Sequence, residues 1–118
     1  MNLVTVSHVQ GRMPVTVLHL QGRINLGNSP ELEQAARTEV AAGARYILID
    51  LSNAPSLTSA GIRAILVIHK MLESAVQNKA RHLKLVSPTP YVREVLKVAG
   101  LLDYLEVFSS LDEAVASF

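Results

Sequence analysis

Hydroxyl side chains gather in one short stretch of the chain, DLSNAPSLTSAGIRAIL at residues 50–66. Four of them precede or begin an apolar segment with helical character: Ser52, Ser56, Thr58 and Ser59. A serine or threonine directly before a helix can accept a hydrogen bond from a free backbone N–H, which stabilises the helix by about 1 kcal/mol. A hydroxyl can also act as a nucleophile beside a base, or carry a phosphate at the positive end of the helix dipole. The stretch therefore allows three roles, namely capping, nucleophilic catalysis and phosphorylation.

Other residue types that carry catalysis give weaker signals. The chain has no cysteine, which excludes thiolate catalysis and cysteine-bound zinc. The segment TSAG lacks the leading glycine of the G-x-S-x-G turn of serine hydrolases. The segment GRINLG has no lysine–serine pair after its second glycine, so it is not a phosphate-binding P-loop. We therefore expect no catalytic residue and no cofactor.

The four histidines are His8, His19, His69 and His82, and none of them forms an H-E-x-x-H motif or an i, i+4 pair. His8 and His19 fall on successive predicted strands, so a metal site between them is a minor alternative to surface or core histidines. His69 falls on the same helical face as apolar neighbours, which is typical of a histidine at the edge of a core. We expect no metal.

Composition narrows the class of protein. Of the 118 residues, 49% are apolar and 18% are charged, the formal net charge is +1, and the aromatic residues are three tyrosines and two phenylalanines. This balance predicts one globular domain over residues 1–118, without the basic stripe or the aromatic rings that nucleic-acid binding needs. The N-terminus does not resemble a signal peptide, and the longest apolar run, 64–68, is too short to cross a bilayer. We expect a cytoplasmic protein without direct membrane insertion.

Alternation of apolar and polar residues predicts that the chain opens with an antiparallel hairpin. Residues 3–9 and 15–22 both alternate with a period of two, and a turn of the composition QGRMP separates them. The positions that we expect to point outward include Thr5, Ser7, Thr16 and His19.

Helices and strands follow the hairpin in alternation. Asn28 and Glu31 resemble a capping box before a helix that runs to about Ala42, with Gly43 as its stop signal. Residues 46–51 are apolar in succession, which suits a strand covered on both faces. The later predicted elements are a helix over 60–77, a strand over 82–87, a short helix ending at Gly100, a strand over 105–108 and a terminal helix with Ser110 as N-cap. The order predicts an α/β fold, in which helices pack against a mixed sheet.

Two features of the 60–77 segment point beyond capping, although composition alone favours capping. Gly61 costs about 1 kcal/mol relative to alanine inside a helix, so tight packing or the close approach of another molecule must justify it. The helix is apolar around much of its circumference, so the part beyond the sheet needs another helix or a partner. A phosphate on Ser59 would place about two negative charges beside that surface and could expel a partner without unfolding the domain.

The same stretch resembles the signature of STAS domains, the family of anti-sigma factor antagonists, which reads approximately D-L-S-x-V-x-x-[IL]-D-S-[ST]-G-[LI]. Asp50, Leu51 and Ser52 match its opening, Leu57 its aliphatic position, Ser59 its phosphorylatable serine, and Gly61 and Ile62 its close. The segment GRINLGNSPELEQAA resembles the second strand and first helix of the family, and LVSPTPYVREVLKVAGLLDYLEVFSSLDEAV resembles its C-terminal part. The resemblance covers nearly the whole chain in order.

This resemblance implies a mixed sheet of four or five strands with helices packed on one side, and a regulator in a partner-switching system. Unphosphorylated, such a domain binds an anti-sigma factor that is also a serine kinase; phosphorylation of the serine at Ser59 releases it, and a phosphatase resets the system. The domain is then the substrate of the kinase and not itself an enzyme. The expected docking surface combines the 23–28 loop, the 53–59 turn and the start of the 60–77 helix. Its expected partner-binding residues are Arg23, Asn25, Asn53, Ser56, Thr58, Ser59, Ala60, Gly61 and Arg63.

The chain departs from the family pattern at three positions. Thr58 stands where an acidic residue usually precedes the phosphorylated serine, Ala60 replaces the following serine or threonine, and Asn25 replaces an aspartate. Thr58 is therefore the alternative phosphorylation site. Three other functions stay open. One is a constitutive STAS interaction module, such as a transport-complex or scaffold subunit in which Thr58 and Ser59 are only caps. The second is a small-ligand or nucleotide sensor that uses the same helix end, and the remotest is an unrecognised hydrolase.

Overall fold

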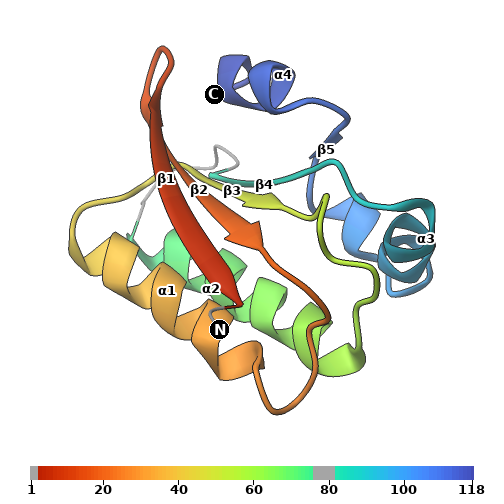
Figure 1. Cartoon of the computed structure of the whole chain (residues 1–118). Coiled ribbons are helices and arrows are strands. Elements are labelled where there is room, and N and C mark those ends of the chain that lie inside the picture. Colours follow the sequence, from red (N-terminus) through yellow and green to blue (C-terminus); the bar gives the residue numbers. More distant parts are fainter. Residues whose placement is uncertain (1–2, 76–81) are drawn as a thin grey trace.

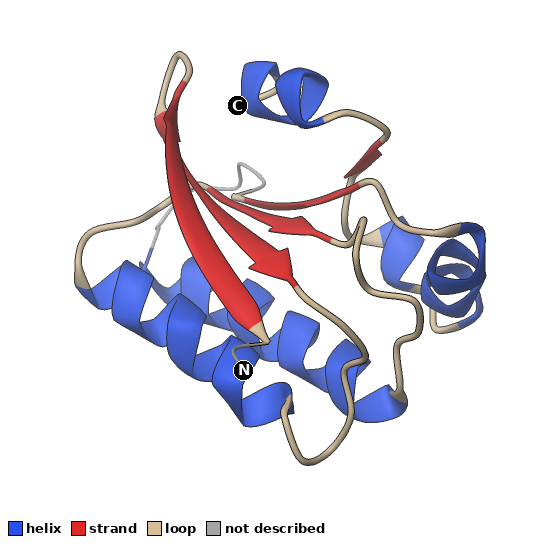
Figure 2. Cartoon of the chain, in the orientation of Figure 1, coloured by secondary structure: helices blue, strands red, loops and turns tan. Residues whose placement is uncertain are grey.

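The computed structural model, which describes residues 3–75 and 82–118, is built around a five-stranded mixed sheet (Figures 1 and 2). The strands are β1 (Val4–Gln10), β2 (Pro14–Leu20), β3 (Ile47–Asp50), β4 (Leu83–Val86) and β5 (Val107–Phe108). The helices are α1 (Ser29–Ala41), α2 (Ser59–Ala75), α3 (Pro90–Val98), the short 3-10 helix η1 (Leu101–Asp103) and α4 (Leu111–Ala116). The predicted elements thus all appear, and residues 76–77 of the predicted helix lie outside the described residues.

The strands lie in the sheet in the order in which they occur along the chain. β1 and β2 form the predicted antiparallel hairpin, and β2, β3, β4 and β5 are parallel neighbours. In the hairpin Thr5 lies opposite His19, and in the parallel pair His19 lies opposite Asp50. Because the parallel strands end at the same edge of the sheet, the loops after β2 and β3 leave it side by side.

Each face of the sheet has its own apolar core. The larger core lies between the sheet and α1, α2, α3 and η1, and it contains the side chains of Leu18, Leu20, Ile47, Ile49, Leu83 and Leu85. The smaller core lies on the opposite face, where Val15, Val17, Leu48 and Val86 meet Ala114 and Val115 of α4. The apolar run in β3 is confirmed as a strand covered on both faces, because Ile47, Leu48 and Ile49 are all fully buried.

The α/β fold class is confirmed, and α4 refines the arrangement of the helices. The resemblance implied helices on one side of the sheet, whereas α4 packs on the other side, as Figure 1 shows. Lys84 of β4 helps to hold α4 there, because its Nζ donates hydrogen bonds to the carbonyl oxygen (3.1 Å) and the Oγ (2.9 Å) of Ser117.

A neighbouring helix accounts for the broad apolar surface of α2. α1 and α2 lie side by side under the same face of the sheet (Figure 1), and Ile62 and Leu66 pack against the core between them. Within the described residues, the apolar circumference of α2 is therefore largely satisfied by the fold itself and does not require a partner.

Two local expectations prove wrong. Thr16, expected to point outward, is only 4% exposed, because β2 is an interior strand whose face at Thr16 is covered. Asn28 and Glu31 do not form a capping box: the Asn28 side chain makes no capping hydrogen bond, and the Glu31 carboxylate instead accepts from the backbone N–H of Val4 at 2.9 Å. Ser110 is confirmed as the N-cap of α4, since its hydroxyl accepts from the Glu113 N–H.

Candidate functional site

The predicted docking segments meet at one edge of the sheet, where the loops after β2 and β3 run in parallel. Ile24 and Leu57 form an isolated parallel bridge between the two loops. The backbone N–H of Gly22 donates to the Asn53 carbonyl oxygen at 3.0 Å, and that of Thr58 donates to the Ile24 carbonyl oxygen at 3.3 Å. These bonds join the 23–28 loop to the segment that leads into α2.

Thr58 is the residue that caps α2. Its hydroxyl accepts a hydrogen bond from the Gly61 N–H (3.4 Å), and its carbonyl oxygen accepts the first helical bond, from Ile62. The same hydroxyl donates to the Ile24 carbonyl oxygen at 2.9 Å. Thr58 thus satisfies the start of the helix and ties it to the neighbouring loop.

Ser59 is the first residue of α2 and is exposed. Its hydroxyl makes no hydrogen bond within residues 3–75 and 82–118. Both residues are exposed, but their hydroxyls differ in hydrogen bonding: that of Thr58 is bonded to Ile24 and Gly61, whereas that of Ser59, at the positive end of the helix dipole, has no such bond within the described residues.

Gly61 is explained by packing inside the protein. A Cβ atom at this position would lie 2.9 Å from Ile24 Cγ2, and closer still to Leu57 Cδ1. Gly61 is buried, and only a glycine lets α2 approach the Ile24–Leu57 bridge so closely. Gly61, predicted to bind a partner, is therefore covered by its own neighbours Ile24 and Leu57.

The 23–28 loop is shaped by its own asparagines and presents one apolar side chain. The Asn25 side-chain oxygen accepts from the N–H groups of Gly27 (2.9 Å) and Asn28 (3.1 Å), and the Asn28 side-chain oxygen accepts from the Asn25 N–H at 2.8 Å. Leu26, at the tip, is 81% exposed. Sequence reasoning did not single out Leu26, although a lone leucine between polar loop residues was the available signal.

The remaining predicted site residues lie on the loops after β2 and β3 and in the first turns of α2. Arg23 is exposed beside the bridge, and Arg63 is exposed one helical turn after Ser59 on α2. Asn53 is exposed, and its side-chain amide donates to Gln21 Oε1 at 3.4 Å, whereas Ser56 and Ala60 are half-buried. The surface formed by Arg23, Asn25, Leu26, Ser59 and Arg63 is called the loop–helix surface below. It carries two positive charges and one exposed apolar side chain.

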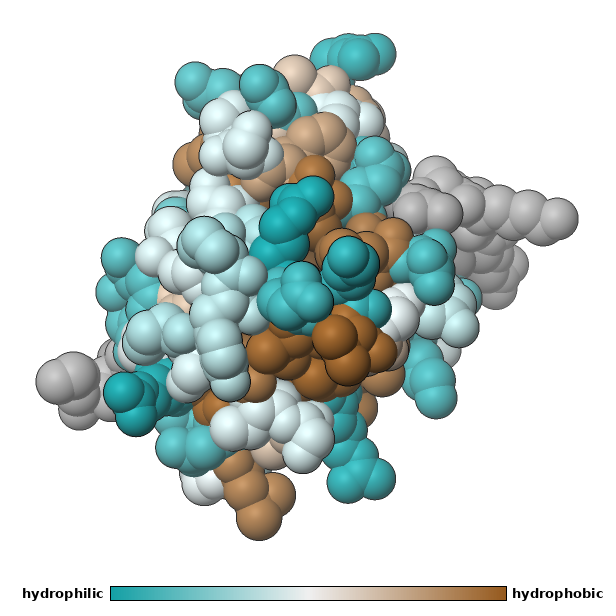
Figure 3. Space-filling model, turned by 90° about the vertical axis from the view of Figure 1, so that its right-hand side faces the viewer, coloured by the Kyte–Doolittle hydropathy of each residue, from teal (hydrophilic) through white to brown (hydrophobic). Residues whose placement is uncertain are grey.

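Another face of the molecule also exposes apolar side chains. On the side that carries α3 and β5, apolar side chains gather amid hydrophilic ones (Figure 3). Val98 of α3 is 80% exposed, nearly the same fraction as Leu26. Exposure alone therefore does not distinguish Leu26; it differs from Val98 in lying on the 23–28 loop, whose Ile24 is bridged to Leu57 just before α2.

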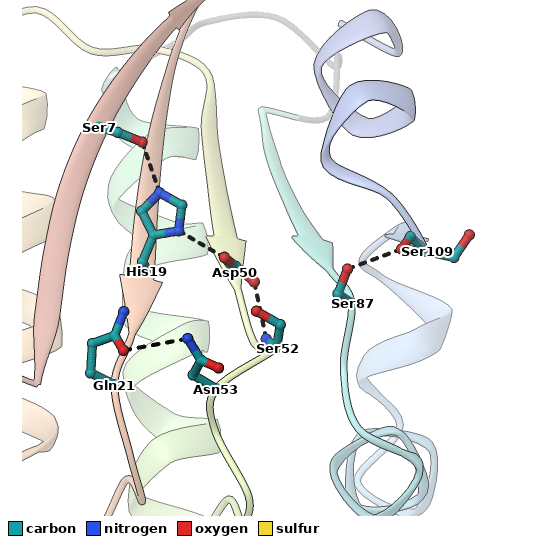
Figure 4. A network of polar contacts seen from close by, with 8 residues as sticks. All are labelled: Ser7, His19, Gln21, Asp50, Ser52, Asn53, Ser87 and Ser109. Carbon is teal, nitrogen blue, oxygen red and sulfur yellow. Dashed lines mark hydrogen bonds and ion pairs between the residues drawn. The ribbon is translucent and has the colours of Figure 1, made fainter.

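A chain of polar side chains crosses the sheet next to these loops, on the face that also carries α4 (Figure 4). Ser7 Oγ lies 2.8 Å from His19 Nε2, and His19 Nδ1 lies 2.7 Å from Asp50 Oδ2. Asp50 Oδ1 also accepts from the Ser52 N–H at 3.0 Å. Partial burial acts to raise the pKa of Asp50, but the hydrogen bonds from Ser52 and His19 and the charge of His19 outweigh it and hold the pKa below the ordinary value.

The two hairpin histidines do not come together. In the hairpin register His8 lies opposite Thr16 and His19 opposite Thr5, so the two imidazoles point to opposite faces. His8 pairs with Glu39 at 2.6 Å, and His19 pairs with Asp50. Across residues 3–75 and 82–118 no group of three or more histidine, aspartate or glutamate side chains could hold a metal ion.

In the same residues no helix has the length and apolar character needed to cross a membrane.

Comparisons with known proteins give a consistent result. The model of the STAS domain family matches residues 7–114. A protein of Bordetella bronchiseptica named as an anti-sigma factor antagonist, BtrV, is 35% identical over 99 residues, which cover 84% of this chain and 82% of that protein. The crystal structure of an anti-sigma factor antagonist from Thermotoga maritima superposes with a TM-score of 0.83 at 23% identity, covering 97% of this chain and 92% of that chain. SpoIIAA of Bacillus in its phosphorylated form gives a TM-score of 0.70 at 21% identity and covers 97% of each chain.

Proposed function

The chain belongs to the STAS domain family, and from this membership we propose that it is an anti-sigma factor antagonist in a partner-switching system. The name of the Bordetella relative supports the proposal, because that protein is 35% identical over most of both chains. In this role the protein binds another protein and performs no reaction in doing so. Its proposed partner is an anti-sigma factor that is also a serine kinase, a phosphatase resets the system, and its proposed location is the cytoplasm.

Ser59 is the proposed site of phosphorylation. This assignment rests on the different roles of two adjacent hydroxyls. Thr58 caps α2, so the hydroxyl of the exposed Ser59 can be modified without loss of the cap. Modification of Thr58 would break its bonds to Ile24 and Gly61, and would disturb the start of the helix. A kinase can therefore reach Ser59 at a lower structural cost than Thr58.

Electrostatics gives the proposed switch its mechanism. The loop–helix surface includes Arg23, Arg63 and the exposed Leu26 together with Ser59, so the unphosphorylated face suits an acidic partner with an apolar pocket. A phosphate on Ser59 adds about two negative charges, which neutralise the two arginines. The helix N-terminus tolerates the phosphate, so the fold persists while the charge complementarity to the partner is lost.

The test is incubation with ATP and candidate anti-sigma factor kinases. We expect one phosphate, mapped by mass spectrometry to Ser59 in the wild-type chain and absent in Ser59→Ala. Thr58→Ser, which keeps a capping hydroxyl, is the matched control and should accept phosphate at Ser59 as the wild type does. Ser59→Asp should weaken partner binding and leave thermal unfolding nearly unchanged.

Three results would contradict the proposal. Phosphate on Thr58 in Ser59→Ala and in the wild type would move the switch to the neighbouring residue. Tight partner binding without phosphorylation by any candidate kinase would favour a constitutive interaction module. Equal affinity of Ser59→Asp and wild type for the kinase would remove the charge mechanism.

A further inference from the structure

Ser7, His19 and Asp50 are arranged as a nucleophile, a base and an orienting acid. The three side chains lie in a row across β1, β2 and β3, and the distances from Oγ to Nε2 and from Nδ1 to Oδ2 are 2.8 and 2.7 Å (Figure 4). Both distances are those of hydrogen bonds, and the order of groups is that of the Ser-His-Asp triad of acyl-transfer enzymes. Residues separated by 12 and 31 positions in the chain are thus brought into line by strand pairing alone.

The carboxylate determines which nitrogen of His19 carries the proton. Asp50 is held ionised, so its Oδ2 can only accept a hydrogen bond, and the Nδ1 of His19 must donate it. In the neutral imidazole, Nε2 is then unprotonated and accepts the hydroxyl proton of Ser7. This is the tautomer in which a histidine acts as a base toward a serine.

The surroundings keep this geometry in place and leave its side chains partly exposed to solvent. The Ser52 N–H holds the second oxygen of Asp50 at 3.0 Å, so the carboxylate cannot rotate freely. The side chains of His19 and Asp50 remain 24% and 18% exposed, and Ser7 is half-buried on the edge strand. The proposed switch at Ser59 does not use this group of residues.

We propose that Ser7 is an activated nucleophile that accepts the acyl group of an activated ester. Ser7 Oγ forms a bond to the carbonyl carbon as its proton passes to His19 Nε2, and the carbon–oxygen bond to the leaving group breaks when the carbonyl re-forms. The leaving group takes up the proton from His19 and departs as a phenol or alcohol. Water then attacks the acyl-serine with His19 as base, which returns Ser7 and releases a carboxylic acid. The row of three residues activates the nucleophile and does nothing more for the leaving group. The acyl donors that suit it therefore carry good leaving groups.

A fluorophosphonate probe and an aryl acetate test this activity on the full chain. The fluorophosphonate should form one covalent bond, to Ser7, with loss of fluoride, and peptide mapping by mass spectrometry locates it without any variant. Release of nitrophenol from p-nitrophenyl acetate should fall to the background of free serine in Ser7→Ala. General base catalysis contributes about 100- to 10,000-fold, so we expect His19→Gln to slow labelling by roughly 100-fold or more. Asp50→Asn should slow it strongly as well, because it permits the other tautomer.

The control variants separate activation of Ser7 from general reactivity and from loss of fold. Thr5→Ala removes a hydroxyl from β1, the strand that also carries Ser7, at the position opposite His19, and it should leave labelling unchanged. Ser59→Ala should also label like the wild type, so a failure of the proposed switch and a failure of this inference are distinguishable. Circular dichroism and thermal unfolding establish that each variant is folded. Probe on other serines, or a wild-type rate equal to that of folded His19→Gln, would overturn the proposal and leave the row a structural network only.

Discussion

The Oγ1 atom of Thr58 lies 2.9 Å from the carbonyl oxygen of Ile24, and this hydrogen bond joins the start of α2 to the loop after β2. The same oxygen accepts from the Gly61 N–H, so one side chain organises both the helix end and the neighbouring loop. Thr58 fulfils these structural roles, whereas the Ser59 side chain makes no hydrogen bond within the described residues. The assignment of different roles to two adjacent hydroxyls follows from this relationship.

Replacement of Thr58 by valine should destabilise the protein, whereas replacement of Ser59 by alanine should not. Loss of the cap and of the bond to Ile24 is expected to lower the free energy of unfolding by about 1–2 kcal/mol. Ser59→Ala should stay within about 0.5 kcal/mol of the wild type, as exposed substitutions usually do. Urea unfolding followed by circular dichroism measures both. Equal stability of the two variants would contradict the assignment of the cap to Thr58.

Gly61→Ala should lower stability even though alanine is the better helix former. Alanine gains about 1 kcal/mol of helix propensity over glycine, but its Cβ would lie 2.9 Å from Ile24 Cγ2. Overpacking of this kind costs typically about 1–3 kcal/mol, so after the gain in helix propensity we expect a net loss of up to roughly 2 kcal/mol. The same urea experiment gives the value. A variant more stable than the wild type would show that Ile24 and Leu57 can move away from the added Cβ at little cost in free energy.

Leu26→Ala should weaken binding of the proposed anti-sigma partner by about tenfold, which is the effect expected for an apolar anchor worth about 1.4 kcal/mol. Val98→Ala is the matched control, because Val98 is exposed to nearly the same extent (80% against 81%) but lies on α3. Isothermal titration calorimetry compares the two variants with the wild type. A stronger effect of Val98→Ala would move the docking surface to the α3 side of the molecule.

Acidification should remove a stabilising contribution from Asp50. The pKa of this carboxyl is lowered in the folded state from an ordinary value of 3.8, so the folded state favours the ionised form. The contribution is therefore fully present above the ordinary value and disappears as the pH falls through the folded-state pKa. Asp50→Asn should be less stable than the wild type at neutral pH, by about 1–3 kcal/mol for the loss of hydrogen bonds to a charged group. The difference between the two proteins should shrink in strong acid.

Chemical denaturation of both proteins over a series of pH values follows this difference. Asp103→Asn, at an exposed position on η1, is the control and should differ little from the wild type throughout the series. A constant difference between Asp50→Asn and the wild type at all pH values would contradict the lowered pKa of Asp50.

Lys84→Met should loosen the packing of α4 on the sheet, because it removes the ammonium group and keeps an unbranched side chain of similar length in β4. The ammonium group donates two hydrogen bonds to Ser117 and lies 4.4 Å from the centre of the Phe118 ring. Without these contacts we expect faster hydrogen exchange in Leu111–Ala116, with little change in the first turns of α2. Lys97→Met, at an exposed position on α3, is the matched control. Unchanged exchange in α4 would show that its apolar contacts suffice.

The sequence by itself determined most of the elements and the end of the sheet at which the loop–helix surface lies. Period-two alternation identified the hairpin, successive apolar residues identified β3 as a strand buried on both faces, and Ser110 marked the start of α4. These signals are local, because propensity, capping and burial patterns act over a few residues. The meeting of the 23–28 loop with the start of α2 was also expected, on the resemblance of the motifs to one family.

The tertiary structure decided which of several equivalent residues does what. Thr58 and Ser59 are both suitable caps. Thr58 takes this role in the fold, where its hydroxyl also donates a hydrogen bond to the carbonyl oxygen of Ile24, 34 positions away. Ser7, His19 and Asp50 belong to three separate segments, and only the register of three strands places them in a row. The physical reason is common to both cases. A hydrogen bond between distant segments depends on where strand pairing and packing bring them, and a local pattern of residue types contains no such information.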